Sequence, residues 1–256
     1  MISIKSPREL SLMKEAGRIV ALTHQALAKA VRPGVTTREL DELAEKVIRD
    51  AGATPSFKGY GGFPAAICVS VNDVLVHGFP SDTKLKEGDV VALDVGACYK
   101  GYHGDSAWTY AVGEISEDAK RLLEVTRQSL FEGLSKVRAG AHLGDISNAI
   151  QTYVESFHFS LPIDYTGHGI GNHLHEDPNV PNVGKAGTGV ILRKGMCLAI
   201  EPMVQMGKPH TRVLSDGWTV VSKDHSISAH YEHTIVVTED GYEIFTTLDP
   251  EKEGNW

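Results

Sequence analysis

The sequence predicts an α+β fold built from two pseudo-symmetric halves. Three observations support this class: helix-start patterns come in pairs, segments rich in β-branched residues lie between the pairs, and parts of the chain recur. Residues 31–34 (VRPG) match residues 137–140 (VRAG) at an offset of 106, and residues 85–88 (LKEG) match residues 192–195 (LRKG) at an offset of 107. Two matches at nearly one offset favour an internal duplication over coincidence. We expect both halves to form one domain over residues 1–256.

Two helices are predicted at the start of the chain. The motif SPRE at residues 6–9 has Ser at a candidate N-cap, Pro at the first helical position and Glu at the third. It opens an amphipathic stretch that runs to the RPG motif at residues 32–34. The motif TTRE at residues 36–39 repeats the capping pattern, and apolar residues then recur at helical spacing as far as Gly52. The second helix therefore follows the first directly.

A second pair of helices is predicted further along the chain. One helix begins after Ser116, where Glu117 and Asp118 suit the positive end of the helix dipole, and another covers roughly residues 145–157. The remaining regular segments are short runs rich in Val, Ile, Thr and aromatic residues, separated by Gly, Asp and Lys turn signals. We expect strands, mostly in hairpins, over residues 65–77, 89–112, 196–203 and 227–245.

Two carboxylates end matched apolar segments in the two halves. Asp94 lies within VVALDV and Glu201 closes MCLAIE, and each follows its copy of the repeated motif. Burying an unpaired carboxylate costs several kcal/mol, so each side chain needs a cation or dense hydrogen bonding. Asp105 returns eleven residues after Asp94, across a turn at residues 99–101. That spacing can place both aspartates on neighbouring antiparallel strands, facing one point.

Two further side chains extend this polar set. His168 lies in the motif TGHGIG, whose glycines let the backbone crowd closely and leave the imidazole free to reach inward. Glu232 lies within an alternating segment over residues 227–237. Because alternate strand residues share a face, one face of this segment carries Ser228, His230, Glu232 and Thr234.

Together these side chains predict a metal site. For any one carboxylate, a helix cap or a buried ion pair would be the ordinary explanation. Four carboxylates in apolar strands, two of them at duplicated positions, instead favour bound cations. An oxygen-rich set with one imidazole suits Mn²⁺, Fe²⁺, Co²⁺ or Zn²⁺. Two divalent ions would balance the charge and could generate hydroxide at neutral pH, so we expect a dinuclear hydrolase.

The order of motifs resembles one family over essentially the whole chain. The motifs are VHG at residues 76–78, Asp94, GYHGD at 101–105, TGHGIG at 166–171, HE at 175–176, AIEP at 199–202 and EHT at 232–234. This combination is similar to the type I methionine aminopeptidases, in the short bacterial form without an N-terminal extension. Only 64 positions separate His168 from Glu232, which leaves no room for the helical insertion of the type II subclass.

The resemblance implies a fold and a set of roles. The fold would be the pita-bread (creatinase/aminopeptidase) fold, with two pseudo-symmetric halves around a dinuclear metal site and a single catalytic metallopeptidase domain. Two divalent ions per chain (Co, Mn, Fe or Zn) would be held by five ligands. One ion would take Asp94, Asp105 and Glu232, and the other would take Asp105, His168, Glu201 and Glu232.

The resemblance also implies how a peptide is cleaved. Hydroxide activated by the metal ions would attack the first peptide bond, with Glu201 taking the proton of the water. His175 would donate a hydrogen bond to the scissile carbonyl, and His77 would contact the peptide beyond that bond. The chain would thus remove the N-terminal methionine from nascent proteins and peptides whose second residue is small.

An apolar pocket is predicted for the methionine side chain. An unbranched thioether is flexible enough to fill a pocket lined by aromatic and sulfur-containing side chains. The predicted lining residues are Phe57, Tyr60, Phe63, Cys68 and Trp218. The alternative is that these aromatic residues belong only to the core and that the enzyme is a broad aminopeptidase. Leu174, where many bacterial relatives carry Phe, favours that alternative slightly.

Two other functions were weighed against this one. Xaa-Pro aminopeptidases share the fold but generally carry a domain before the catalytic half, whereas the catalytic pattern starts almost immediately here. A non-catalytic binding protein with the same fold would be expected to lose metal ligands or histidines. This sequence retains all five predicted metal ligands and both histidines, His77 and His175. We therefore expect an active aminopeptidase.

Composition narrows the partners and the location. The formal net charge of −8 provides no basic field for a phosphate backbone, so direct nucleic-acid binding is not expected. No apolar run has the length of a signal peptide or a membrane span, which predicts a cytoplasmic protein without membrane contact. The expected partners are the N-termini of nascent polypeptides, with transient ribosome association and a monomeric chain.

Overall fold

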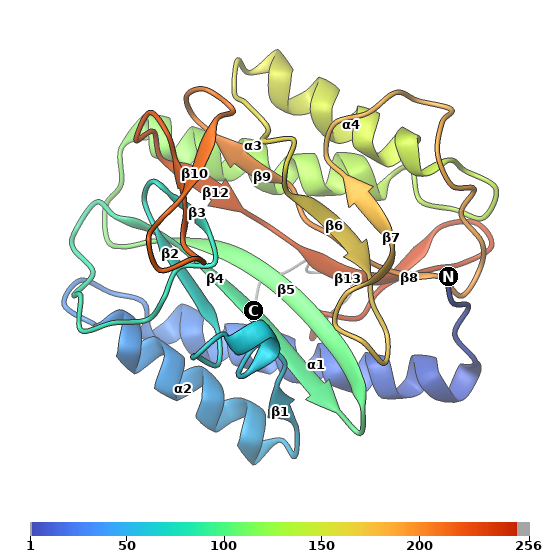
Figure 1. The fold of residues 1–256 in the computed structure, drawn as a ribbon, viewed down its shortest axis with the longest axis horizontal. Helices are drawn as coiled ribbons and strands as arrows, with labels where there is room; N and C mark the ends of the chain where they lie inside the picture. Colours follow the sequence, from blue (N-terminus) through green and yellow to red (C-terminus); the bar gives the residue numbers. More distant parts are fainter. Residues whose placement is uncertain (1, 250–256) are drawn as a thin grey trace.

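Two pairs of helices enclose the strands of the protein (Figure 1). The computed structural model describes residues 2–249; the predicted domain over residues 1–256 also includes residue 1 and residues 250–256, which lie outside the described residues. The first pair of helices lies along one side of the strands and the second pair along the other. The helices are α1 (Pro7–Ala30), α2 (Thr37–Asp50), α3 (Glu117–Leu134) and α4 (Leu143–Ser156), with a short 3₁₀ turn, η1 (Tyr60–Gly62).

The helices begin where the capping patterns predict, with one correction. The Ser6 and Thr36 side chains each accept a hydrogen bond from the backbone three residues on, which completes the capping boxes of α1 and α2. The fourth helix begins at Leu143 rather than at residue 145. The Asp145 carboxylate accepts from the backbone N–H of His142 at 2.9 Å, so Asp145 is the third helical residue and closes the cap.

Most strands belong to two sheets, one in each half. In the first sheet β4 (Val90–Tyr99) pairs with β1 (Thr54–Pro55), β2 (Cys68–Val71) and β5 (Tyr102–Ala111). The second sheet has the order β14-β13-β8-β6-β7, with β6 (Thr166–Gly169), β7 (Glu176–Pro181), β8 (Cys197–Ile200), β13 (His233–Val237) and β14 (Tyr242–Ile244). Smaller sheets join β12 (Ser228–His230) to β9 (Met203–Gln205), and β10 (Thr211–Val213) to β11 (Val220–Ser222) and β3 (Val74–Val76).

Three predicted strand runs are each divided between sheets. The run over residues 65–77 splits into β2, which pairs with β4, and β3, which pairs with β11. The run over residues 196–203 splits into β8 and β9, because Pro202 at the break has no backbone N–H to donate to a ladder. The run over 227–245 splits into β12, β13 and β14, and the first break falls at Tyr231 and Glu232. The sequence missed β6 and β7, whose glycines and prolines resemble loop signals. It also missed β1, β10 and β11.

The repeated motifs make the same hydrogen bonds in both halves. Gly34 N–H donates to the Leu85 carbonyl at 2.8 Å, and Gly140 N–H donates to the Leu192 carbonyl at 2.9 Å. Leu85 and Leu192 return equivalent bonds to the residues after those glycines, at 2.8 Å in each case. Each helix pair also covers its own apolar core, the first around Leu93 and the second around Leu198. The halves are therefore pseudo-symmetric in bonding as well as in order.

The two halves are joined through β5 and β13. The Thr234 hydroxyl accepts from the backbone N–H of Asp105 at 3.0 Å and donates to its carbonyl at 2.8 Å. Two residues away, the backbone N–H of Glu232 donates to the Ala107 carbonyl at 2.8 Å. These bonds bring two of the predicted metal ligands to one seam. Among the described helices, none is both long and apolar enough to cross a membrane.

Candidate metal and substrate site

All the site residues predicted from the sequence line one pocket between the halves. Its volume is about 170 Å³, smaller than the ~300 Å³ at which typical small-molecule pockets begin, so it suits a single side chain. The lining comes from strands of both halves and from the loops beside them. The pocket is lined by Phe57, Tyr60, Phe63, Cys68, His77, Asp94, Asp105, His168, Leu174, His175, Glu201, Trp218 and Glu232.

Asp94 and Asp105 lie diagonally across the β4–β5 hairpin. Asp94 pairs with Ala107, and Asp105 pairs with Gly96, so each aspartate is two residues from the partner of the other. Because residues two apart share a face of a strand, both carboxylates project to the same side of the sheet. The spacing of eleven residues in the sequence produces this register directly.

His168 reaches the cluster because the glycines beside it let β6 pack closely. A Cβ on Gly167 would overlap the carbonyl oxygen of Ala199, and one on Gly169 would overlap that of Asp177. The Nδ1 atom of His168 is 2.9 Å from its neighbour's carbonyl at Gly169, so Nδ1 carries the proton and Nε2 is the acceptor. Nε2 then lies 3.8 Å from Asp105 Oδ2 and 3.6 Å from Glu201 Oε1.

Glu201 and Glu232 meet just beyond the end of paired strands. Ile200 of β8 pairs with His233 of β13, so extending the register by one residue sets Glu201 opposite Glu232. The Asn182 side chain donates to the Glu201 carbonyl at 2.9 Å and fixes its backbone. Glu232 is 2% exposed, and the side chain of Glu201 is 12% exposed. Both carboxylates are therefore largely withdrawn from water.

The carboxylates lack the partners that buried anions need. Asp94 Oδ1, Asp105 Oδ1 and Glu232 Oε1 are buried and have no hydrogen-bond partner within residues 2–249. Burial raises the pKa of Asp94 to about 7, and it raises the pKa of Asp105, Glu201 and Glu232 well above the usual range. Mutual repulsion of the carboxylates adds to the pKa increase at Asp105 and Glu232. A divalent cation would remove both costs, so this donor set fits bound metal.

The two remaining predicted histidines stand at the pocket mouth. His175 Nδ1 is 2.8 Å from the Tyr60 hydroxyl, and its ring centroid is 4.2 Å from that of His168. His77 follows β3 with a positive φ of 59°, a conformation that is costly for a residue with a side chain. Burial lowers the pKa of His77 to about 4 and also lowers the pKa of His175. Both imidazoles are thus neutral at pH 7.

Aromatic rings that pack edge to face form the apolar part of the pocket. Phe63 and Trp218 pack edge to face at 5.3 Å between centroids, and Trp218 also contacts the His77 ring at 6.3 Å. Phe63 and Cys68 are almost fully buried, while Tyr60 is 45% exposed at the rim. The structure adds Leu174, which is 2% exposed, to the residues that the sequence assigned to this pocket.

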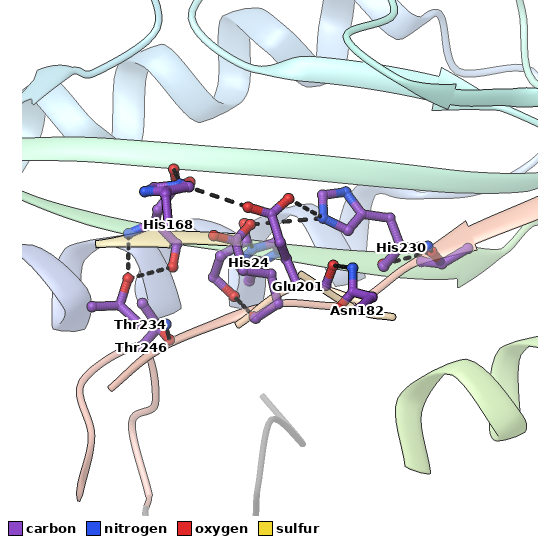
Figure 2. A network of polar contacts seen from close by, with 11 residues as sticks. His24, His168, Asn182, Glu201, His230, Thr234 and Thr246 are labelled. Carbon is purple, nitrogen blue, oxygen red and sulfur yellow. Dashed lines mark hydrogen bonds and ion pairs between the residues drawn. The ribbon is translucent and has the colours of Figure 1, made fainter. Parts of the chain in front are cut away.

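Two other histidines, His230 and His233, lie near Glu232 in the sequence, and their side chains point in different directions. His233 points away from the cluster, with Nδ1 2.8 Å from the Thr246 hydroxyl. His230 points into it, with Nε2 3.3 Å from Glu201 Oε2, and Figure 2 shows Glu201 between His230 and His168. The sequence did not assign His230 to the site. The available signal was the alternation that puts His230 and Glu232 on one face.

Comparison with known proteins shows the family of the chain. The profile of metallopeptidase family M24 matches residues 11–239. The chain is 56% identical over 248 residues to methionine aminopeptidase 1 of Bacillus subtilis (strain 168), which covers 97% of this chain and 100% of that protein.

Solved structures show the same likeness in three dimensions. The crystal structure of methionine aminopeptidase from Thermotoga maritima matches with a TM-score of 0.95 and 50% sequence identity, covering 96% of this chain and 100% of that chain. A prolidase from Pyrococcus furiosus matches with a TM-score of 0.79 and 21% identity, covering 96% of this chain and 66% of that one. At that lower identity the likeness concerns the fold alone.

Proposed function

The chain belongs to metallopeptidase family M24 and has its pita-bread fold, and on this premise we propose that it is a methionine aminopeptidase. It would remove the N-terminal methionine from peptides and nascent proteins when the second residue is small. One observation carries the proposal: the five metal-ligand candidates and the apolar pocket line the same small cavity, which is about 170 Å³ in volume. The side chain before the scissile bond would therefore lie beside the metal-ligand candidates.

We propose that two divalent ions bind to the five candidate ligands. Asp94, Asp105 and Glu232 would hold one ion, and Asp105, His168, Glu201 and Glu232 would hold the other. Mn²⁺, Fe²⁺, Co²⁺ and Zn²⁺ all accept such ligands. When bound, these ions supply Lewis acidity, which lowers the pKa of water and polarises a carbonyl group.

The remaining steps belong to residues of the chain. Glu201 would take the proton of the attacking water, because it is both a candidate metal ligand and a carboxylate that lines the pocket. His175 would donate a hydrogen bond to the carbonyl oxygen, where negative charge grows in the transition state. Its Nδ1 lies 2.8 Å from the Tyr60 hydroxyl. With that hydroxyl as the donor, the proton would be on Nε2 and available for the bond to the carbonyl.

Specificity would arise from two parts of the cavity. The buried rings of Phe63 and Trp218, with Phe57, Cys68 and Tyr60, would hold the methionine side chain. The free α-amino group would lie on the Asp94 side of the cluster, which confines cleavage to the first bond. His77 and its loop would crowd the second residue, so small residues would pass and large ones would clash.

A panel of four peptides tests this function. With one fixed metal condition, kcat/KM is measured for Met-Ala-Ser, Leu-Ala-Ser, Met-Lys-Ser and formyl-Met-Ala-Ser. Only Met-Ala-Ser should be cleaved efficiently. Equal values for Met-Ala-Ser and Leu-Ala-Ser would refute the methionine pocket and indicate a broad aminopeptidase. Equal values for the first and third peptides would refute crowding by His77, and cleavage of the formylated peptide would refute recognition of the amine.

The same assay addresses the other functions of this fold. An Ala-Pro peptide should not be cleaved, whereas an Xaa-Pro aminopeptidase would release alanine from it. A non-catalytic binding protein would cleave none of the peptides after metal reconstitution. Turnover of Met-Ala-Ser without turnover of Ala-Pro therefore separates the proposed function from both alternatives.

The proposal extends to the setting of the reaction. We propose a single catalytic domain that works as a monomer in the cytoplasm, acts on the N-termini of nascent polypeptides and associates with the ribosome transiently. Size-exclusion chromatography with light scattering would test the monomer.

A further inference from the structure

His230 presents a buried ring nitrogen to the carboxylates. The residue is 2% exposed, and its Nε2 has no hydrogen-bond partner within residues 2–249. Nε2 lies 3.3 Å from Glu201 Oε2 and 3.8 Å from Glu232 Oε2. An unpaired buried polar atom is costly, so an atom in this position calls for a partner.

Hydrogen bonding to the carboxylates does not supply that partner. His230 Nε2 makes no hydrogen bond with Glu201, although the ring nitrogen and the carboxylate oxygen Oε2 are only 3.3 Å apart. One ligand atom from each of His230, Glu201 and Glu232 lies within 4.8 Å of the other two. That arrangement suits three atoms directed at a common point.

The spacing of these atoms is that of ligands around one ion. Two donor atoms that each lie ~2.1 Å from a metal are about 3.0 to 3.7 Å apart at ordinary coordination angles. The distances from His230 Nε2 to its two oxygens, 3.3 and 3.8 Å, fall in or next to this range. His168 Nε2, a predicted ligand, has nearly the same distances of 3.6 and 3.8 Å to its own two carboxylates.

The backbone holds His230 in this place. The backbone N–H of His230 donates to the Thr109 hydroxyl oxygen at 2.9 Å, and the Thr109 hydroxyl donates to the backbone carbonyl of His230 at 2.9 Å. On its other side, β12 pairs with β9 and sets His230 opposite Met203. These bonds tie His230 to both halves of the fold, so its imidazole is positioned before a ligand arrives.

We propose that His230 is an additional metal ligand, which shares an ion with Glu201 and Glu232. The ligand atoms of Glu201, His230 and Glu232 all lie within 4.8 Å of one another. His230 would therefore add a second imidazole to the ion that Asp105, His168, Glu201 and Glu232 would hold. Such a centre favours ions that bind nitrogen well, such as Zn²⁺ and Co²⁺, over Mn²⁺. This inference rests on the metal site of the proposed function.

Proton NMR of the Co²⁺-loaded protein can count the bound imidazoles. An imidazole bound to Co²⁺ gives a strongly shifted resonance from its ring N–H, which disappears in D₂O. The wild type should show two such resonances. His230→Gln should remove one, His168→Gln should remove the other, and the exposed His225→Gln control should remove neither. Co²⁺ affinity, measured by titration calorimetry, should fall at least ~10-fold in His230→Gln.

The result that would contradict this inference differs from the result that would contradict the proposed function. A single shifted N–H resonance in the wild type, lost in His168→Gln and kept in His230→Gln, would overturn the inference and leave the proposed function intact. Wild-type protein that binds no Co²⁺ and cleaves no Met-Ala-Ser would overturn the proposed function itself. The wild-type spectrum and His168→Gln decide the count even if His230→Gln fails to fold, and circular dichroism of the metal-free variants identifies that failure.

Discussion

The hydroxyl of Tyr60 lies 2.8 Å from Nδ1 of His175, with 5.2 Å between the ring centroids. Tyr60 stands at the rim of the proposed methionine pocket, so this contact joins that pocket to the histidine. With the tyrosine O–H as donor to Nδ1, Nε2 would keep the N–H proposed to face the substrate carbonyl. Binding of the first side chain and stabilisation of the transition state would then be linked through one hydrogen bond.

The contact between Tyr60 and His175 predicts that substitutions of these two residues lower kcat by different amounts. His175→Ala should lower kcat on the order of 10²-fold or more, since it removes a donor to the growing negative charge. Tyr60→Phe should lower kcat by less, because Nε2–H persists but is no longer enforced. Steady-state kinetics with Met-Ala-Ser, alongside metal analysis of each variant, checks both. A change in KM alone for His175→Ala would mean that this histidine binds only the ground state.

A second prediction concerns the carboxylate opposite Glu232. Glu201→Gln should abolish nearly all turnover and weaken metal binding, because an amide is a poorer ligand and a far weaker base than a carboxylate. Atomic absorption after dialysis and kcat measured with saturating metal separate these two losses. Near-normal turnover of the metal-replete variant would remove Glu201 from the role of base. Glu239→Gln, on the turn after β13, serves as the surface control.

The close packing of β6 on β8 predicts a stability change without any change in charge. In Gly167→Ala the added methyl group would collide with the backbone of Ala199, which cannot move without disturbing the sheet. Overpacking of this kind costs about 1–3 kcal/mol. Gly241→Ala is the matched control, because the atom closest to its added Cβ would be 3.9 Å away. Urea unfolding of the metal-free proteins should show a loss for Gly167→Ala alone.

His24 predicts part of the acid sensitivity of the fold. The ring is fully buried, with its two nitrogens 2.9 Å from the Tyr110 hydroxyl and 3.0 Å from the Ser106 carbonyl. Burial lowers the pKa of His24 to about 4, from 6.5 in an unfolded chain. The unfolded state therefore binds the proton first as the pH falls. Stability that is complete above pH 6.5 is lost down to about pH 4.

The measurement for His24 is the slope of stability against pH. One proton contributes about 1.4 kcal/mol per pH unit, so His24→Gln should flatten the slope between pH 6.5 and 4 by up to that amount. Gln can still donate to the Ser106 carbonyl. His210→Gln, at an exposed position, should keep the wild-type slope. An unchanged slope in His24→Gln would show that His24 is already neutral, or equally protonated, in both states.

Local patterns in the sequence predicted the elements that depend on neighbouring residues. The capping boxes at Ser6 and Thr36 fixed the starts of two helices, since each is completed within four residues. The hairpin register of Asp94 and Asp105 also followed from spacing, because a tight turn leaves few alternative pairings. Errors arose where strands changed partners, as at Pro202, and where glycine-rich strands such as β6 looked like loops.

The sequence by itself determined which side chains could not be buried alone. Asp94, Asp105, Glu201 and Glu232 lie in apolar segments, and the free energy of burying a carboxylate requires compensation wherever the chain folds. Only the tertiary structure decided which groups share that compensation. Alternation in the sequence placed His230 and Glu232 on one face. The distance of 3.3 Å between His230 Nε2 and Glu201 Oε2, however, depends on strand pairing: β12 pairs with β9, whereas β13 pairs with β8. Distances of this kind are set by strand partners far apart in sequence, and no local pattern specifies them.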